Sequence, residues 1–108
     1  MPKVSIVIPV YNEEANIAGL VDQVAAALLP TGWAFELLLI DDGSRDGTAA
    51  AMRRLSEHFP WLHCIFLIRN YGQSTALQAG FDHAEGDYIV TLDGDLQNDP
   101  ADIPTQLS

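Results

Sequence analysis

Four apolar runs recur along the chain, and a longer, more polar segment separates each run from the next. The runs cover Val4–Pro9, Phe35–Ile40, Leu62–Ile68 and Tyr88–Leu92. They are rich in branched and aromatic residues and alternate little with polar ones, which is typical of strands buried on both faces of a sheet. The pattern therefore predicts four buried strands.

Three amphipathic helices are predicted between these runs, because apolar residues recur there at spacings of three and four. Asn12 is expected to cap the first helix, with Glu13 and Glu14 in its first turn, and Ser74 is expected to cap the third. The residues expected to face the core are, in chain order, Ile17, Leu20, Val21, Val24, Leu28, Met52, Leu55, Phe59, Leu77, Phe81 and Ala84.

Strands that alternate with single helices indicate right-handed crossovers. We therefore expect a Rossmann-like, three-layer α/β/α fold with a mainly parallel four-stranded sheet in the order 3-2-1-4. In such sheets ligands bind outside the carboxyl ends of the strands. Polar residues follow each of the four predicted strands: Tyr11–Glu13, Asp41–Asp42, Arg69–Asn70 and Asp93–Asp95.

Asp93 and Asp95 form a candidate metal site after the fourth strand. Residues two apart in an extended chain project to the same side, and two adjacent carboxylates repel unless a cation lies between them. Oxygen ligands of this kind suit Mg²⁺ or Mn²⁺, and Gln97 offers a further neutral oxygen. The alternative is an acidic turn that only solvates the end of a strand.

The other strand ends carry groups that suit a nucleotide. A carboxylate at Asp41 or Asp42 can accept from a base or a ribose, Tyr11 offers a ring for stacking, and Arg69 suits a phosphate. Each has a structural alternative. The segment Asp41–Ser44 is also good turn chemistry, a tyrosine beside a core often packs, and an arginine often pairs with a neighbouring carboxylate.

The composition limits the class of protein. The 108 residues suit one domain, and a net charge of -10 argues against nucleic-acid binding and against docking of this segment on anionic lipid. No apolar run approaches the ~20 residues of a membrane span, and no signal peptide is recognisable. The single cysteine, Cys64, excludes an internal disulfide and is interpreted as a core thiol. We expect a cytoplasmic domain.

Several common motifs are absent from the sequence. No P-loop, dinucleotide fingerprint or hydrolase elbow occurs, and an EF-hand counted from Asp93 lacks its glycine and glutamate. His58, His63 and His83 have no metal-site spacing and are interpreted as surface or helix-end residues. Two alternatives remain: a nucleotide- or metal-binding module without turnover, and a haloacid-dehalogenase-type phosphotransferase with Asp93 as nucleophile.

The strand-end motifs resemble those of family 2 glycosyltransferases of the GT-A fold. The resemblance is carried by Val4–Glu14, by Ile40–Ser44 with Asp46 and Thr48, and by Leu92–Gln97 as the D-x-D motif. Arg69–Gln73 and Gln97–Pro100 are similar to the branch that transfers sugars onto polyprenyl phosphates, such as the dolichol-phosphate and undecaprenyl-phosphate glycosyltransferases. Gly94 departs from the alanine common in this branch.

The resemblance implies a role for each strand-end residue. Pro9, Tyr11, Glu13, Asp41, Asp42 and Asp93 would bind the nucleotide, with Asp42 facing the base and Asp41 supporting it. Asp93, Asp95 and Gln97 would hold Mg²⁺ or Mn²⁺ on the diphosphate, and Asp95 is the expected catalytic residue. The metal would neutralise charge on the departing nucleoside diphosphate, in a reaction that inverts the sugar.

The resemblance also implies that residues 1–108 form the nucleotide-sugar-binding, N-terminal part of a GT-A domain. Family members carry a second half for the acceptor, so we expect no sugar transfer from this chain alone. The expected donor is a nucleoside-diphosphate sugar, with uridine favoured over guanosine, and the expected acceptor is a polyprenyl phosphate. The full-length protein is expected at the cytoplasmic face of the membrane. Self-association is expected through the surface that the missing half would cover.

Overall fold

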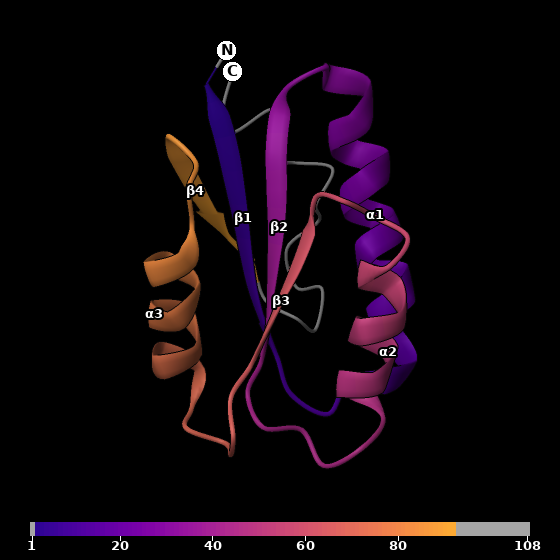
Figure 1. The fold of residues 1–108 in the computed structure, drawn as a ribbon, viewed down its shortest axis with the longest axis vertical. Helices are drawn as coiled ribbons and strands as arrows, with labels where there is room; N and C mark the ends of the chain where they lie inside the picture. The colour runs from indigo at the N-terminus through magenta and orange to yellow at the C-terminus, as the bar shows by residue number, and fades with distance from the viewer. Residues whose placement is uncertain (1, 93–108) are drawn as a thin grey trace.

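The computed structural model describes residues 2–92, in which four strands form one sheet in the order β3-β2-β1-β4 (Figure 1). The strands are β1 (Lys3–Val10), β2 (Ala34–Asp41), β3 (Leu62–Phe66) and β4 (Tyr88–Thr91). All three neighbouring pairs are parallel. The predicted parallel sheet and its strand order are confirmed.

Helices cover both faces of the sheet, as the sequence predicts. Helices α1 (Ile17–Leu28) and α2 (Thr48–Ser56) lie on one face, and α3 (Gln73–His83) lies on the other (Figure 1). Two short 3-10 helices, η1 (Glu14–Asn16) and η2 (Leu29–Thr31), flank α1. Among residues 2–92, no helix combines the length and apolar character needed to cross a membrane.

The larger core lies between the sheet and the α1–α2 layer. The whole predicted stripe of α1 is fully buried there, as is Met52 of α2, whereas Leu55 and Phe59 are only partly buried. Each fully buried aliphatic side chain contributes roughly 1.5–3 kcal/mol. The α1 stripe comprises Ile17, Leu20, Val21, Val24 and Leu28.

The smaller core lies under α3, and here the predicted inward face is partly wrong. Ala76 and Gly80 are the buried residues of α3, while Phe81 is 39% exposed. The cause is a close approach of α3 to the sheet: a Cβ on Gly80 would lie 2.3 Å from Cγ1 of Val7 and 2.9 Å from Cδ1 of Ile40. Ala76 and Gly80 therefore lie closest to the sheet, Leu77 and Ala84 pack against the same core while partly buried, as predicted, and Phe81 is turned toward solvent.

The two predicted helix caps are also wrong. Asn12 has a positive φ of 52° and lies in a loop before η1, and α1 begins only at Ile17. Ser74 lies inside α3, which begins at Gln73 without a side-chain cap. At Asn12, contacts with the loop after β2 replace the local capping that sequence spacing suggests.

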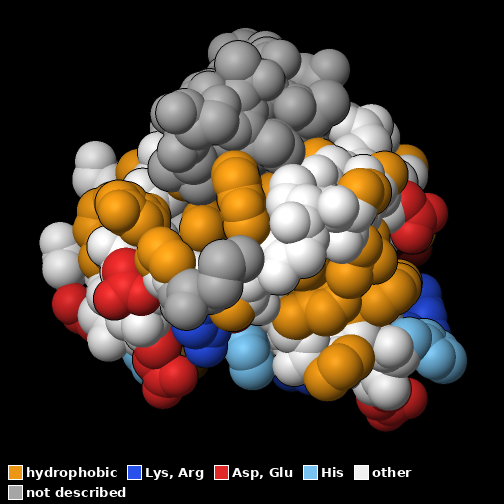
Figure 2. All heavy atoms as spheres, turned by 90° about the horizontal axis from the view of Figure 1, so that it is seen from above, with side chains coloured by type: hydrophobic (Ala, Val, Ile, Leu, Met, Phe, Trp, Pro, Cys, Tyr) orange, Lys and Arg blue, Asp and Glu red, His pale blue; other side chains and the backbone are white. Residues whose placement is uncertain are grey.

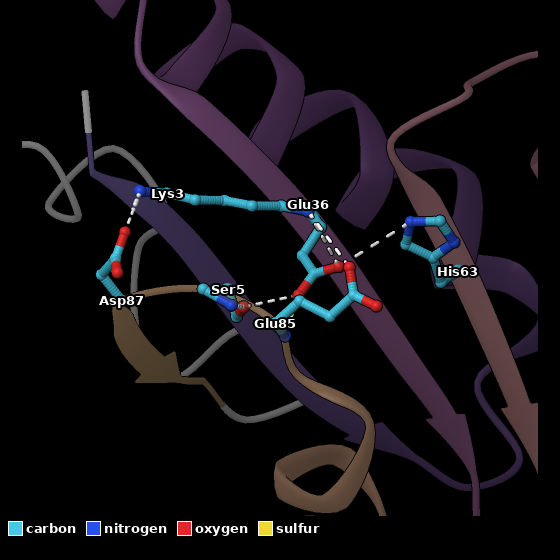
Figure 3. A network of polar contacts seen from close by, with 7 residues as sticks. Lys3, Ser5, Glu36, His63, Glu85 and Asp87 are labelled. Atoms are coloured by element: carbon cyan, nitrogen blue, oxygen red, sulfur yellow. Dashed lines mark hydrogen bonds and ion pairs between the residues drawn. The ribbon is translucent and has the colours of Figure 1, made fainter.

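A buried polar network fastens the beginning of the strands, at the end of the sheet opposite the predicted site (Figure 3). Glu36 of β2 is 3% exposed, and its Oε2 accepts from Oγ of Ser5 at 2.6 Å and from the backbone N–H of Glu85 at 2.7 Å. Nζ of Lys3 and Nε2 of His63 lie 3.6 and 3.8 Å from its Oε1. Seen from this end of the molecule, hydrophobic side chains occupy the middle of the surface and charged ones lie toward the rim (Figure 2).

Candidate functional site

The carboxyl ends of three strands lie side by side. Val10 of β1 pairs with Asp41 of β2, which pairs with Phe66 of β3. The ladder continues one step further, because the backbone N–H of Asp42 donates to the carbonyl of Val10 at 2.9 Å. The loops that follow these strands therefore start from one edge, as the topology predicts.

Pro9 occupies a central strand without disrupting its pairing to β2. A parallel strand directs the backbone groups of alternate residues to alternate neighbours, and the carbonyl of Val7 accepts from Leu92 on the β4 side. The missing N–H of Pro9 therefore faces the β4 side, beyond the last described pair of that ladder, between Val7 and Thr91. Pro9 itself is buried.

The loops after β1 and β2 are bonded to each other. The backbone N–H of Asn12 donates to Oγ of Ser44 at 2.8 Å, and Oδ1 of Asn12 accepts from the backbone of Arg45 at 2.9 Å. The backbone N–H of Glu13 donates to Oγ1 of Thr48 at 2.9 Å. Asn12 thus joins two loops rather than capping a helix.

A hollow of about 350 Å³ lies beside these loops. Oε1 of Glu14 accepts from the backbone of Gly47, and Asp46 accepts from both the hydroxyl and the backbone of Thr48. The hydroxyl bond from Thr48 lowers the pKa of the Asp46 carboxyl, although desolvation opposes it. The hollow is acidic, so it does not suit a phosphate; its lining residues are Asn12, Glu13, Glu14, Ala15, Asn16 and Asp46.

Asp41 and Asp42 are both buried but serve different loops. Asp41 is 3% exposed, and its Oδ1 accepts from the backbone of Ser44 at 3.0 Å, which closes the turn after β2. Asp42 is 4% exposed and turns to the loop between β3 and α3. Its Oδ1 accepts from the backbone of Tyr71 at 2.8 Å, and its Oδ2 accepts from the backbone of Gly72 at 3.0 Å.

Asn70 completes this arrangement, because its Nδ2 donates to Oδ2 of Asp42 at 3.0 Å and to the Asp42 carbonyl at 3.2 Å. These three partners lie 28 to 30 residues away in the chain. A local sequence motif cannot predict contacts over such a separation. The pairing of β2 with β3 brings Asp42 close to the loop that contains Asn70, Tyr71 and Gly72. The expectation that Asp42 faces a base stays a prediction. In the structure the Asp42 carboxylate contacts the β3–α3 loop.

The loop after β3 is longer than the sequence predicts. The strand was expected to reach Ile68, but β3 ends at Phe66 and Ile68 is 91% exposed. The guanidinium carbon of Arg69 lies 5.0 Å from the ring centre of Tyr71. No ion pair joins Arg69 to a carboxylate of residues 2–92, so in this part of the chain the structural alternative of a carboxylate partner is not found, and Arg69 contacts a tyrosine ring.

The predicted site residues fall into three groups. Tyr11 is 40% exposed directly after β1, and Glu13 is partly buried. Pro9, Asp41 and Asp42 are buried at the same edge. The predicted metal ligands Asp93, Asp95 and Gln97 lie outside the described residues.

The sequence matches one family over almost its whole length. A profile described as "Glycosyl transferase family 2" matches residues 5–108. The chain belongs to glycosyl transferase family 2. As a family 2 chain, it is 50% identical over 103 residues to the undecaprenyl-phosphate 4-deoxy-4-formamido-L-arabinose transferase of Salmonella paratyphi A. The match covers 94% of this chain and 32% of that relative, so this chain spans about a third of the length of the curated relatives it matches.

Solved glycosyltransferase structures share the fold of this family 2 chain. The mannosyltransferase PcManGT from Pyrobaculum calidifontis, in complex with GDP-Man and Mn²⁺, has a TM-score of 0.79 and 31% identity over 87% of this chain and 28% of that one. S. aureus TarS in complex with UDP-GlcNAc has a TM-score of 0.75 and 28% identity over 86% of this chain and 26% of that one. The likeness confirms the expected α/β fold of GT-A type.

Proposed function

We propose that this chain is the donor-binding part of a glycosyltransferase that transfers a sugar from a nucleoside diphosphate to a polyprenyl phosphate. The observation that carries the proposal is the 50% identity to an undecaprenyl-phosphate transferase over 103 residues. The geometry supports it, because three strand ends converge on one edge and leave the Tyr11 ring accessible there. An arabinose-type sugar like that of this relative is the first donor to test.

The proposed nucleotide site comprises Pro9, Tyr11, Glu13, Asp41, Asp42 and Asp93. In it the Tyr11 ring would stack against the base, and the bonds that close the turn at Asp41 would keep the edge rigid. Uridine is the proposed base. PcManGT is in complex with GDP-Man and TarS with UDP-GlcNAc, which supports a nucleoside diphosphate as the general class of ligand. The preference for uridine over guanosine is part of this proposal.

The proposed metal site comprises Asp93, Asp95 and Gln97, which follow β4 directly in the sequence. All three offer oxygen atoms, a donor set that fits Mg²⁺ or Mn²⁺. When bound, the metal would supply charge neutralisation at the diphosphate. The role left to the chain is to bind and orient the donor, and a phosphate acceptor, already anionic, needs little help from a general base.

Titration calorimetry with uridine diphosphate tests this proposal. Two like unit charges about 4 Å apart repel by roughly 4 kcal/mol at an effective dielectric of ~20, so in EDTA the diphosphate should avoid this acidic chain. We expect binding in millimolar Mn²⁺ and little in EDTA. Asp95→Asn should weaken the metal-dependent binding by at least tenfold, which corresponds to about 1.4 kcal/mol.

The matched control is Asp22→Asn, which makes the same change in net charge on the exposed side of α1. It should bind as the wild type does. Equal affinity of the wild type in EDTA and in Mn²⁺ would contradict the metal site. Sugar transfer itself is measured with the full-length protein, as release of the nucleoside diphosphate in the presence of a polyprenyl phosphate.

A further inference from the structure

Burial does little to fix the position of β4 on its neighbour. Within residues 2–92 this strand, Tyr88–Thr91, pairs only with β1. Three of its four residues are exposed and the fourth is partly buried, so neither face of the strand is covered. The register of a strand is weakly specified where no face is buried. Another feature of the structure must therefore fix the register of β4.

Two buried side chains, one from β1 and one from β2, hold the segment that leads into β4 (Figure 3). Oγ of Ser5 donates to Oε2 of Glu36 at 2.6 Å and accepts from the backbone N–H of Gly86 at 2.8 Å. The same Oε2 accepts from the backbone N–H of Glu85 at 2.7 Å. A buried polar group that loses its partner costs more than the bond itself contributes, so these contacts strongly favour one arrangement.

Gly86 makes this contact specific to one register. A Cβ at this position would lie 2.5 Å from Oγ of Ser5 and 2.9 Å from the carbonyl oxygen of Lys3, closer than real Cβ atoms approach. The residues on either side of it, Glu85 and Asp87, both carry side chains. A shift of β4 by one residue in either direction would therefore bring a Cβ to a place where only glycine fits.

The strand β4 connects this contact to the proposed metal motif. The N–H of Leu92 donates to the carbonyl of Val7 at 3.1 Å, and Asp93 follows directly in the sequence. From Gly86 to Leu92 the chain advances about 20 Å, at ~3.3 Å per residue. A shift of one residue would displace the start of the motif by about 3.3 Å, whereas metal-ligand distances are held to within about 0.2 Å. The register of β4 therefore matters for a cation site that follows it.

We propose that Ser5, Glu36 and Gly86 are positioning residues that form a register clamp, which places the Asp93–Asp95 metal motif by fixing β4 on β1. This inference rests on the proposed function, because the role of the metal motif comes from there. The register clamp contacts neither the cation nor the diphosphate, and it acts from the opposite end of the sheet. Disturbing it should therefore weaken the binding of a divalent cation while the rest of the sheet stays folded.

The test uses two variants of the register clamp and two matched controls. Ser5→Ala removes both hydrogen bonds of the hydroxyl, and Gly86→Ala forces a Cβ against it. The first control, His63→Ala, removes another neighbour of the Glu36 carboxylate, one that lies on β3, away from β4. The second control, Val24→Ala, removes two methyl groups from the core under α1 and so lowers stability without touching the register clamp.

Titration calorimetry gives the Mn²⁺ concentration at which the binding of uridine diphosphate is half-maximal. This concentration should rise by about tenfold or more in Ser5→Ala and Gly86→Ala, as it does when groups that orient metal ligands are removed. It should stay within about twofold of the wild-type value in both controls. An equal rise in Val24→Ala would overturn the proposal, because a general loss of stability would then explain the effect.

Amide hydrogen exchange reports on the register clamp without any ligand. In Ser5→Ala the amide of Leu92, which bonds across to β1, should exchange faster relative to that of Asp42, which bonds to Val10 at the other side of β1. In Val24→Ala the two amides should change together, because only the overall stability is altered. A Leu92 amide that changes in step with Asp42 in both clamp variants would overturn the proposal.

The two measurements separate this proposal from the proposed function. A wild type that binds no uridine diphosphate in Mn²⁺ contradicts the proposed function, and with it the link between the register clamp and a metal. The exchange rates then still show whether the register clamp fixes β4. A wild type that binds in Mn²⁺, with an unchanged Mn²⁺ dependence in both clamp variants, leaves the proposed function standing and overturns the positioning role.

Discussion

Glu36 is a carboxylate inside a buried strand, and its neighbours determine its charge. Burial alone raises the pKa of this carboxyl, but the bonds from Ser5 and from the backbone of Glu85, with the nearby Lys3 and His63, outweigh it and hold the pKa below its ordinary value of 4.5 (Figure 3). The ionised form is therefore the one that the folded state stabilises.

Stability should consequently depend on pH through Glu36. A carboxyl whose pKa is lower in the folded state contributes its full stabilisation above pH 4.5, and the contribution is lost as the pH falls through the folded-state pKa. Glu36→Gln should lower the free energy of unfolding by about 1.5–3 kcal/mol at pH 7. Urea unfolding between pH 3 and pH 7 checks this.

The difference in the free energy of unfolding between Glu36→Gln and the wild type should become smaller as the pH falls from 7 toward 3. Glu57→Gln, which changes an exposed carboxylate beyond the end of α2, should show no comparable gap at pH 7. A gap for Glu36→Gln that stayed constant down to pH 3 would mean that packing, not charge, explains the loss.

At the scale of single residues, the sequence predicts which positions meet but not how they bond. The convergence of Asp41, Asp42 and Arg69 follows from strands ending at a common edge. The partners of Asp42 could not be predicted, because they depend on the register between β2 and β3 and on a strand that ends two residues early. The metal motif lies outside the described residues, and its ligands remain predictions.

Two helical glycines offer a matched test at the scale of elements. Gly80 of α3 packs on the sheet, where an added Cβ would meet Val7 and Ile40, whereas an added Cβ on Gly19 of α1 would meet nothing within 4 Å. Alanine is favoured over glycine inside a helix by about 1 kcal/mol. Crowding a packed core costs about 1–3 kcal/mol.

The two substitutions should therefore have opposite signs. Gly19→Ala should raise the free energy of unfolding by up to about 1 kcal/mol, because only the helix preference acts. Gly80→Ala should lower it by about 1–2 kcal/mol, because crowding exceeds that preference. Thermal and urea unfolding measure both. Stabilisation by both substitutions would show that α3 does not depend on its close approach to the sheet.

The same glycine explains why α3 is predicted less well than α1. The α1 stripe consists of large apolar residues, so its period alone identifies the buried face. The buried face of α3 consists of Ala76 and Gly80, which a search for large apolar residues overlooks. The buried face of a helix can thus be predicted where it consists of large apolar residues, and less well where close packing requires small ones.

The whole molecule combines an apolar edge with a strong net negative charge. Within residues 2–92, β4 pairs only with β1, and Tyr88 and Ile89 are 53% and 45% exposed on it. An edge strand with exposed apolar side chains favours association, whereas a net charge of -10 opposes it. Salt screens the repulsion and leaves the apolar contact, so the balance should shift with ionic strength.

We therefore expect the chain to self-associate through β4, and more strongly as salt increases. Ile89→Lys places a charge on the edge and should shift the chain toward the monomer, as measured by analytical ultracentrifugation at 0.05 and 0.5 M NaCl. Gln23→Lys, which makes the same change in net charge on the exposed side of α1, is the control. A wild type that stayed monomeric at high concentration and high salt would contradict this expectation.

The overall architecture is the most predictable part of the molecule. Strands alternate with single helices, and right-handed crossovers then leave few arrangements of four parallel strands. The central position of β1 and β2 follows from their apolar runs, because nearly all of their residues are buried. The pattern of apolar and polar residues does not predict the polar contacts at either end of the sheet, because these form between segments far apart in the sequence.

The strand order β3-β2-β1-β4 has a consequence for synthesis on the ribosome. β1 is made first and meets β2 after α1, but its other neighbour is made some 80 residues later than β1 itself. Until residues 88–91 emerge, one flank of the strand with seven buried residues has no partner. The growing chain thus passes through a long interval in which a strand that is buried in the folded protein is an open edge, and this is the stage at which a chaperone would protect it most.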